Sequence, residues 1–214
     1  MTRMIEQLIF IKAVLLKQNA IFILVINLPM DTFSHIKAVI SITLGLSITH
    51  LLKGAAKQIQ HPGRDKPYWV HNLWALYVFI LLLHFWWWEI SLHEIQHWLF
   101  AEYFFIIIYI VTYYSVCALL YPDDLKDYQD YKDYFYSRRK WIFGILGASY
   151  LLDIIDTEIK GPSYVHHYNI EYPIRNISHF ILCMIAIKVE NRNFHAALVI
   201  VFLLYEASYI LRLF

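Results

Sequence analysis

Ionisable side chains that interrupt apolar stretches are the residues of this sequence best placed to do chemistry. Six of them are candidates for an ion-facing or solute-facing site: Glu206, Glu102, Asp153, Asp156, His84 and His179. A charge at the centre of a bilayer costs about 3 kcal/mol or more, so such groups usually face a protein interior or a polar cavity. Carboxylates gathered in one cavity would bind a cation or, with a histidine beside them, relay protons. The alternative is that these groups pair with Lys37 and Arg175, or reach lipid head groups, and only hold the helices together.

Glu206 is the most informative of these candidates. It follows His195 by 11 residues, which corresponds to about 17 Å along a helix. A carboxylate at that depth does not easily reach the membrane surface. Glu102 and Asp153 are predicted to lie at shallower positions, so a cavity that contains all three would open toward one side of the membrane.

A second chemical signal is the run His93-Glu94-Ile95-Gln96-His97, which has the form H-E-x-x-H. On a helix, two histidines four residues apart share a face and can bind zinc, while the glutamate activates water. A third ligand would come from residues predicted on the same side of the membrane: Asp156, Glu158, His166 and His167. A membrane zinc metalloprotease, or a metal-binding protein without catalysis, is therefore an alternative. The run lies in a short predicted loop, and the chain has 11 histidines, so the pattern alone is weak.

Cofactors have little support in the sequence, and we expect none. His71 and His84 fall on one predicted helix, but 13 residues at about 100° each leave them about 140° apart, on different faces. A single haem between His84 and His179, or the zinc discussed above, are the remaining alternatives. The motifs G-x-G-x-x-G, the P-loop and G-x-S-x-G do not occur, so nucleotide binding and serine hydrolase chemistry have no support.

The elements that must position these residues are transmembrane helices. The chain is 59% hydrophobic and 16% charged, against about 25% charged residues in soluble domains. The stretch Pro67–Glu89 has no charged residue between Lys66 and Glu89. Its roughly 22 residues span about 33 Å as a helix, enough for a hydrocarbon core of about 30 Å. Tyr68 and Trp69 lie at one of its margins and three tryptophans, Trp86 to Trp88, at the other, as is typical of membrane helices.

The predicted fold is all-α, a polytopic transmembrane helix bundle over residues 30–214. Six spans are predicted, separated by loops that contain most of the prolines: Phe33–Leu52, Tyr68–Glu89, His97–Tyr121, Trp141–Ile155, Tyr172–Val189 and Phe194–Phe214. The fourth is short, and an extension toward Tyr136 or Thr157 is the alternative. Residues 1–29 form an apolar N-terminal extension that Lys12, Lys17, Gln18 and Asn19 interrupt. This extension is an interfacial helix, an additional span or a signal-like segment, unless translation begins at Met30.

Orientation follows from the basic residues of the loops. Three alternate loops are rich in Lys and Arg, and the positive-inside rule places them in the cytoplasm. We therefore expect a multi-pass protein of the bacterial cytoplasmic membrane, with the lipid bilayer as its surroundings and no nucleic-acid partner at a net charge of +1. The loop Asp123–Lys140 has tyrosines every three residues, which predicts an interfacial helix with its tyrosines toward lipid. The alternative is that this loop docks a cytoplasmic partner, or that the chain forms a homo-oligomer.

The two halves of the predicted bundle, residues 30–121 and 136–214, share weak similarities at offsets of about 100 residues. Leu44-Gly45-Leu46-Ser47 corresponds to Leu146-Gly147-Ala148-Ser149, and His97 corresponds to His195. Three spans per half would make the repeat inverted, an arrangement in which transporters bind substrates between the halves. Recurrence of small and aromatic residues at helix starts explains the same matches without a duplication.

From Met30 onward the sequence resembles an uncharacterised bacterial family of small, about six-span membrane proteins. The resemblance lies in the stretches LGLSITHLLKG (44–54), YWVHNLWAL (68–76), FWWW (85–88), YFYSRRKWIFG (134–144), LLDIIDT (151–157) and NRNFHAAL (191–198). That family has no established activity, so the resemblance implies the membrane fold and a start near Met30, and it implies no function.

These observations predict an integral membrane protein that is more plausibly a transporter than an enzyme. It would move or sense a small solute or cation, coupled to protons, through an outward-facing polar cavity. The alternatives are the zinc protein considered above and a non-catalytic membrane subunit or scaffold that docks a partner through Asp123–Lys140.

Overall fold

Long apolar runs bounded by proline or polar turns form the helices of this chain. The computed structural model describes residues 32–61, 63, 66–95, 97–161 and 170–213. The helices are α2 (Thr32–Gln60), α3 (Trp69–Trp88), α4 (Phe100–Leu120), α5 (Tyr131–Ile159), α7 (Glu171–Lys188) and α8 (Arg192–Leu213), with the 3-10 helix η1 (Glu89–Glu94) after α3. The described residues contain no strand, so the all-helical prediction is confirmed. The extension 1–29 lies outside the described residues.

Two helices are longer than their predicted spans. α2 continues past Leu52 to Gln60, and α5 begins at Tyr131 rather than Trp141 and ends at Ile159 rather than Ile155. α5 starts where it does because the Asp130 side chain accepts a hydrogen bond from the backbone N–H of Asp133, which satisfies a donor at the helix start. The polar residues that precede Trp141 are therefore part of the helix rather than of the loop.

The prediction of an interfacial helix with tyrosines toward lipid is wrong for the first turns of α5. Tyr131 and Tyr134 are buried, and both rings pack against the His71 ring. The Tyr134 hydroxyl also donates a hydrogen bond of 2.6 Å to the carbonyl of Leu119. The tyrosine spacing instead reflects a helix that runs on into the bundle, because one helical face must fill space beside α3 and α4.

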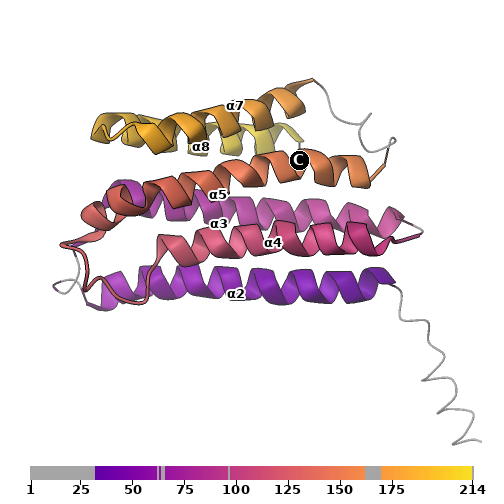
Figure 1. The fold of residues 1–214 in the computed structure, drawn as a ribbon, viewed down its shortest axis with the longest axis horizontal. Helices are drawn as coiled ribbons and strands as arrows, with labels where there is room; N and C mark the ends of the chain where they lie inside the picture. Colours follow the sequence, from indigo (N-terminus) through magenta and orange to yellow (C-terminus); the bar gives the residue numbers. More distant parts are fainter. Residues whose placement is uncertain (1–31, 62, 64–65, 96, 162–169, 214) are drawn as a thin grey trace, which may run out of the picture. The chain divides into compact units, whose positions relative to one another are not determined.

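Residues Ile36–Phe214 form one unit, in which the helices lie side by side in antiparallel succession (Figure 1). α5 packs most extensively on α7 and α4, and α3 packs on α4, α5 and α8. Gly147 permits the close approach of α5 to α7, because a Cβ there would lie 2.8 Å from Met184 Cε and 3.3 Å from Cys183 Cβ. The centre is filled by edge-to-face aromatic rings, among them Trp74, which packs on Phe143 and Phe202.

Within the described residues, four helices are long and apolar enough to cross a membrane: Phe33–Gln60, Trp69–Glu94, Phe100–Leu120 and Arg192–Arg212. α5 and α7 have the length of spans, with 29 and 18 residues, but contain more charged residues. Large apolar side chains such as Leu204, Phe100 and Trp141 are exposed. A surface of this kind fits lipid as the surrounding solvent.

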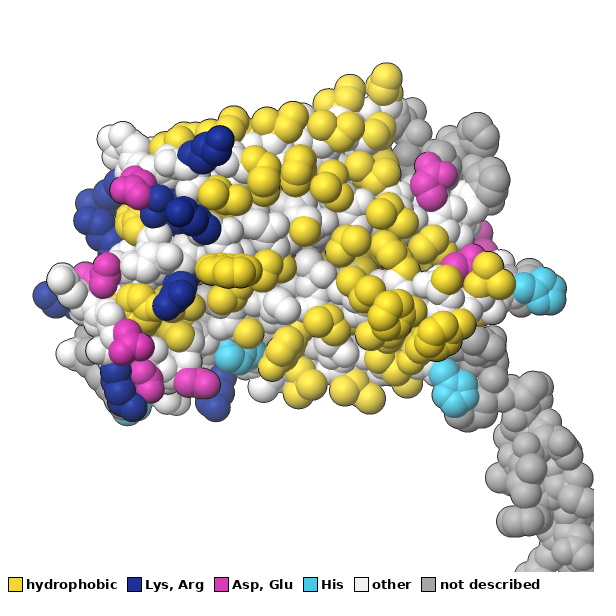
Figure 2. Space-filling view, in the orientation of Figure 1, with side chains coloured by type: hydrophobic (Ala, Val, Ile, Leu, Met, Phe, Trp, Pro, Cys, Tyr) yellow, Lys and Arg dark blue, Asp and Glu magenta, His cyan; other side chains and the backbone are white. Residues whose placement is uncertain are grey.

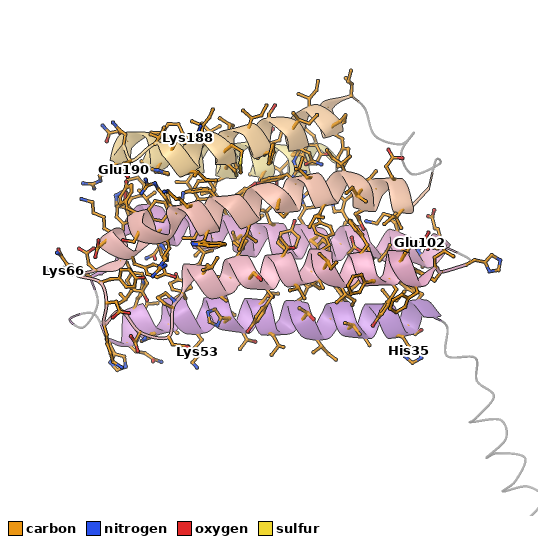
Figure 3. The ribbon with its side chains drawn as sticks, in the orientation of Figure 1. His35, Lys53, Lys66, Glu102, Lys188 and Glu190 are labelled. Atoms are coloured by element: carbon orange, nitrogen blue, oxygen red, sulfur yellow. The ribbon has the colours of Figure 1, made fainter. Side chains whose placement is uncertain are left out.

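Basic side chains gather at one end of this unit. Figure 2 shows Lys and Arg at the end that contains the α2–α3, α4–α5 and α7–α8 connections, and hydrophobic side chains over much of the remaining visible face. Figure 3 labels Lys53, Lys66 and Lys188 at this end and Glu102 at the opposite end. The structure thus places the three basic loops together, as the positive-inside interpretation requires.

Candidate functional site

A buried ionic cluster occupies the half of the helix bundle that lies away from the basic end. It consists of two groups of side chains. The inner group lies about one to two turns inside the helix ends and comprises His84 of α3, Asp153 of α5, Arg175 of α7 and Glu206 of α8. The end group comprises Glu89 of η1, and Asp156 and Lys160 at the end of α5. Each group joins elements that are distant in sequence, so the fold is what creates the site.

Glu206 is the centre of the inner group and is 0% exposed. Its Oε1 accepts a hydrogen bond from Nδ1 of His84, and its Oε2 accepts one of 2.7 Å from Nη2 of Arg175. The Arg175 guanidinium also lies 4.7 Å from the centre of the Tyr209 ring. A buried carboxylate needs both a counter-charge and hydrogen bonds, and Glu206 has them on both oxygens. Because His84 contacts Glu206, protonation of His84 would change the net charge of the inner group.

Asp153 is held by three neutral donors. Its Oδ1 accepts from the hydroxyl of Tyr109 at 2.9 Å. Its Oδ2 accepts from the hydroxyl of Tyr172 at 2.8 Å and from the amide nitrogen of Asn176 at 2.7 Å. Asn176 Oδ1 in turn accepts a bond of 3.3 Å from Arg175, so a continuous chain of hydrogen bonds connects Asp153 to Glu206. Such a chain couples the charges of the two carboxylates through groups that keep fixed positions.

The end group is a lysine between two carboxylates. Lys160 Nζ lies 2.9 Å from Glu89 Oε1 and 2.5 Å from Asp156 Oδ2. All three side chains are almost fully buried, at 6%, 4% and 1% exposure for Lys160, Glu89 and Asp156. Glu89 is placed by the change from α-helix to 3-10 helix after Trp88. Asp156 and Lys160 share a face of α5 because they are four residues apart.

A small cavity lies between the two groups. His84, Glu89, Asp153, Tyr172 and Arg175 line it on the polar side, together with aromatic and aliphatic side chains of α3, α4 and α5. Its volume is about 30 Å³, which is room for one or two water molecules. Carboxylates from both groups therefore face the same water-sized space, an arrangement suited to moving protons and too small for a large solute.

The structure brings most of the predicted candidates together. His84, Asp153 and Glu206 belong to the inner group and Asp156 to the end group. His179 lies next to them, with its Nδ1 donating a hydrogen bond of 2.7 Å to the carbonyl of Arg175 and its ring among aromatic rings.

Glu102 and Lys37 lie apart from this cluster. The Glu102 carboxylate accepts a hydrogen bond of 2.9 Å from the backbone N–H of Leu99 at the start of α4, so it satisfies an N–H of its own helix terminus. Lys37 is exposed on α2. The predicted convergence of Glu102 with Asp153 and Glu206 is therefore wrong, because helix capping holds Glu102 at the surface end of α4.

The H-E-x-x-H run does not form the helical turn that zinc binding by this motif requires. η1 ends at Glu94, and Ile95 has extended backbone angles of φ −74° and ψ 109°. His93 and His97 are exposed, and Gln96, His166 and His167 lie outside the described residues. Within the described residues, no group of three or more His, Cys, Asp and Glu side chains is arranged to hold a metal ion.

The size of the cavity beside His84 argues against the haem alternative. The cavity beside His84 has about 30 Å³, whereas sites for ligands of drug size have roughly 300 Å³ or more. His179 does not line this cavity, and its ring packs 4.4 Å from the Phe202 ring. The cavity beside His84 is therefore too small for a haem.

Sequence reasoning missed Lys160 as part of the site and did not rank Glu89 among the candidates. Lys160 was assigned to a loop because it follows the predicted end of the fourth span. The four-residue spacing of Asp156 and Lys160 was a usable signal for an ion pair on a helix. The three donors to Asp153 had no such signal, because their contacts depend on tertiary packing.

Comparison with known proteins identifies no relative for this chain. No protein-family model matches the sequence, and no curated protein or solved structure matches it significantly. The functional argument therefore depends on the geometry of the buried cluster.

Proposed function

We propose that this protein is a multi-pass membrane protein that binds protons in the buried cluster and uses them to move or sense a small solute or cation. The observation that supports this proposal is a charge imbalance. The cluster contains four carboxylates (Glu89, Asp153, Asp156 and Glu206), and Glu89 and Asp153 line the cavity. Among the described residues, two permanently charged cations accompany them (Lys160 and Arg175). Burying unpaired charge is costly, so the cluster favours the uptake of positive charge.

The size of the cavity favours the proton as the charge that is taken up. About 30 Å³ accommodates one or two waters, whereas a cation such as Na⁺ would need several oxygen ligands around it. His84 is the natural acceptor, because imidazole is the side chain that most readily changes charge near neutral pH. Protonation of His84 beside Glu206 would give the inner group two positive and two negative charges.

The membrane arrangement proposed here has six spans. α5 and α7 would complete the four apolar helices, with their charged side chains Asp153, Asp156 and Arg175 directed into the cluster rather than toward lipid. The basic end would face the cytoplasm of a bacterial cell, which places the cluster in the outer half of the membrane. Protons would then reach the cluster from the outer side.

An inverted 3+3 repeat would fit a transporter of this kind, but the helix packing lends it little support. In such a repeat α2 and α3 would correspond to α5 and α7. α5 lies closely along α7, whereas a groove of about 340 Å³, lined by Leu52, Ile59 and Phe79 among others, lies between α2 and α3. We therefore base the proposal on the cluster and not on symmetry.

Proton flux into liposomes tests this function. The purified protein is reconstituted with an internal pH indicator, a pH gradient is applied, and the membrane potential is clamped with potassium and valinomycin. We expect His84→Gln to reduce flux by about tenfold or more, which corresponds to ~1.4 kcal/mol, because glutamine cannot carry the proton. Glu190→Gln is the matched control, since its side chain is exposed and pairs with Arg139 at the basic end.

Substitution of Glu206 needs a paired design. Glu206→Gln alone leaves Arg175 buried without its counter-charge and endangers folding. The double variant Glu206→Gln with Arg175→Gln removes both charges and keeps hydrogen-bonding side chains at both positions. We expect this double variant to fold and to lose proton flux. Wild-type flux in both the double variant and His84→Gln would contradict the proposed function and would support a purely structural role for the cluster.

A further inference from the structure

The end group carries a second feature that the proposed function does not use. Glu89 Oε1 and Asp156 Oδ2 both contact Lys160, while Glu89 Oε2 and Asp156 Oδ1 are buried and accept no hydrogen bond from any described N–H or O–H group. Buried carboxylate oxygens without donors are rare, because losing hydration without a replacement costs free energy. Two such atoms on adjacent acids point to a missing hydrogen.

The charge of this group supports the same conclusion. If both acids were ionised, Glu89, Asp156 and Lys160 together would carry one net negative charge in a buried site. One added proton makes the group neutral and supplies the donor that the carboxylate oxygens lack. The two carboxyl groups both contact Lys160 Nζ and are therefore close neighbours, so a proton on one acid can be shared with the other. Pairs of carboxyls that share a site cannot easily ionise together.

A metal ion fits this group less well than a proton. The Lys160 ammonium already occupies the position between the two acids at 2.9 and 2.5 Å, and it would repel a second cation there. The two carboxylates alone would also leave most coordination positions of Ca²⁺ or Mg²⁺ without a protein ligand.

Other charged and titratable groups lie around this site on every element that packs against it. They are Asp153 on α5, His84 on α3, Tyr109 and Tyr113 on α4, Tyr172 and Arg175 on α7, and Glu206 on α8. Arg175 is already paired with Glu206, and Asp153 adds a further negative charge, so neither supplies a counter-charge to Glu89. The local deficit of one positive charge in the end group therefore remains.

We propose that Glu89 and Asp156 hold one proton between them, with Lys160 as their counter-ion, and that this site loads protons from the outer end of the helices. Glu89 also lines the cavity that reaches His84, so the proton has a water-sized path to the inner group. The loading role rests on the proposed function, whereas the shared proton itself does not. No other reactant is involved, because the proton leaves one carboxyl oxygen and binds to water or to His84.

Infrared spectroscopy of the full protein in liposomes tests the shared proton directly. A protonated carboxylic acid has a carbonyl stretch that ionised carboxylates lack and that shifts in D₂O. We expect this band at neutral pH in the wild type and its loss in either Glu89→Gln or Asp156→Asn. Each amide leaves one carboxylate paired with Lys160, a neutral group that needs no proton. Glu94→Gln is the matched control, because Glu94 lies on the same 3-10 helix and is exposed.

The outcomes separate this inference from the proposed function. A band that disappears in both variants and persists in Glu94→Gln supports the shared proton, whatever the flux. Absence of the band in the wild type, or its persistence in both variants, overturns the inference even if His84→Gln abolishes flux. If the band behaves as expected but Glu89→Gln carries wild-type flux, the loading role is overturned. Two variants at one site keep the test decisive if one of them does not fold.

Discussion

Two ends of the same bundle bury histidine in opposite ways. At the basic end, His71 and His195 are fully buried among aromatic rings of α5, and no ion pair with a described carboxylate is formed by either. In the other half, His84 forms a hydrogen bond with Glu206 and lines a cavity. All three histidines are buried, at 0% exposure for His71 and His195 and 9% for His84, so residue type and burial alone do not identify a functional histidine. The neighbouring acid and the adjoining space distinguish the two environments.

The comparison also explains why one end can be rigid and the other can respond to charge. Aromatic packing at the basic end depends on shape and is insensitive to pH as long as the histidines stay neutral. The cluster in the other half depends on a balance of charges that one or two protons change. A protein that couples proton binding to motion needs both kinds of region, a fixed frame and a part with alternative charge states.

The largest expected effect comes from breaking the central ion pair. Glu206→Leu leaves Arg175 buried without its counter-charge, and we expect a loss of about 3–5 kcal/mol in the free energy of unfolding. Replacing both residues, Glu206→Leu with Arg175→Met, should restore most of this loss, because no uncompensated charge remains. Thermal unfolding in mild detergent measures both variants. Equal destabilisation by the single and double variants would show that shape, rather than charge, dominates this half as well.

The next effect tests the packing of the basic end. Gly54 faces the ring of Tyr121, and a Cβ on Gly54 would lie 2.1 Å from its Cγ. Gly54→Ala must therefore displace an aromatic ring, and we expect a loss of about 1–3 kcal/mol. Gly45→Ala on the same helix is the control, since nothing lies within 4 Å of its position, and alanine there should raise helix stability by up to about 1 kcal/mol. Indistinguishable unfolding temperatures for the two variants would refute the tight packing.

A third prediction compares the histidines directly. His195→Phe keeps an aromatic ring but loses the hydrogen bond of 2.8 Å between Nε2 and the carbonyl of Val189, so we expect a cost of about 1 kcal/mol. Proton flux in liposomes should remain at the wild-type level. His84→Phe should instead abolish flux, because the ring can no longer carry a proton to Glu206. Loss of flux in His195→Phe would mean that the aromatic end takes part in proton movement.

The sequence predicted the elements of this fold better than their contacts. Hydropathy and proline positions located six helices, because each apolar run is a local property. The two errors at helix ends, in α2 and α5, arose where polar residues continue a helix that tertiary packing stabilises. Glu206 and Asp153 are identifiable from charge in an apolar run, and Lys160 from its four-residue spacing to Asp156. The contact of Lys160 with Glu89 is not, since it depends on the turn that brings Glu89 to the end of α5. Glu102 was a misleading candidate for the opposite reason. It is also a charge in an apolar run, but its carboxylate accepts a hydrogen bond from the nearby backbone N–H of Leu99 and does not reach the cluster.

The smallest expected effect concerns an ion pair at the basic end. Arg139 and Glu190 form a salt bridge in which the glutamate side chain is 71% exposed, so water screens the pair and competes for it. Glu190→Gln should therefore lower the free energy of unfolding by less than about 1 kcal/mol, although its geometry resembles that of Arg175 and Glu206. Added salt should remove this small difference in unfolding temperature and should leave the effect of Glu206→Leu nearly unchanged, because screening reaches only exposed charges. A loss in Glu190→Gln as large as that in Glu206→Leu would show that exposure is not what separates the two halves.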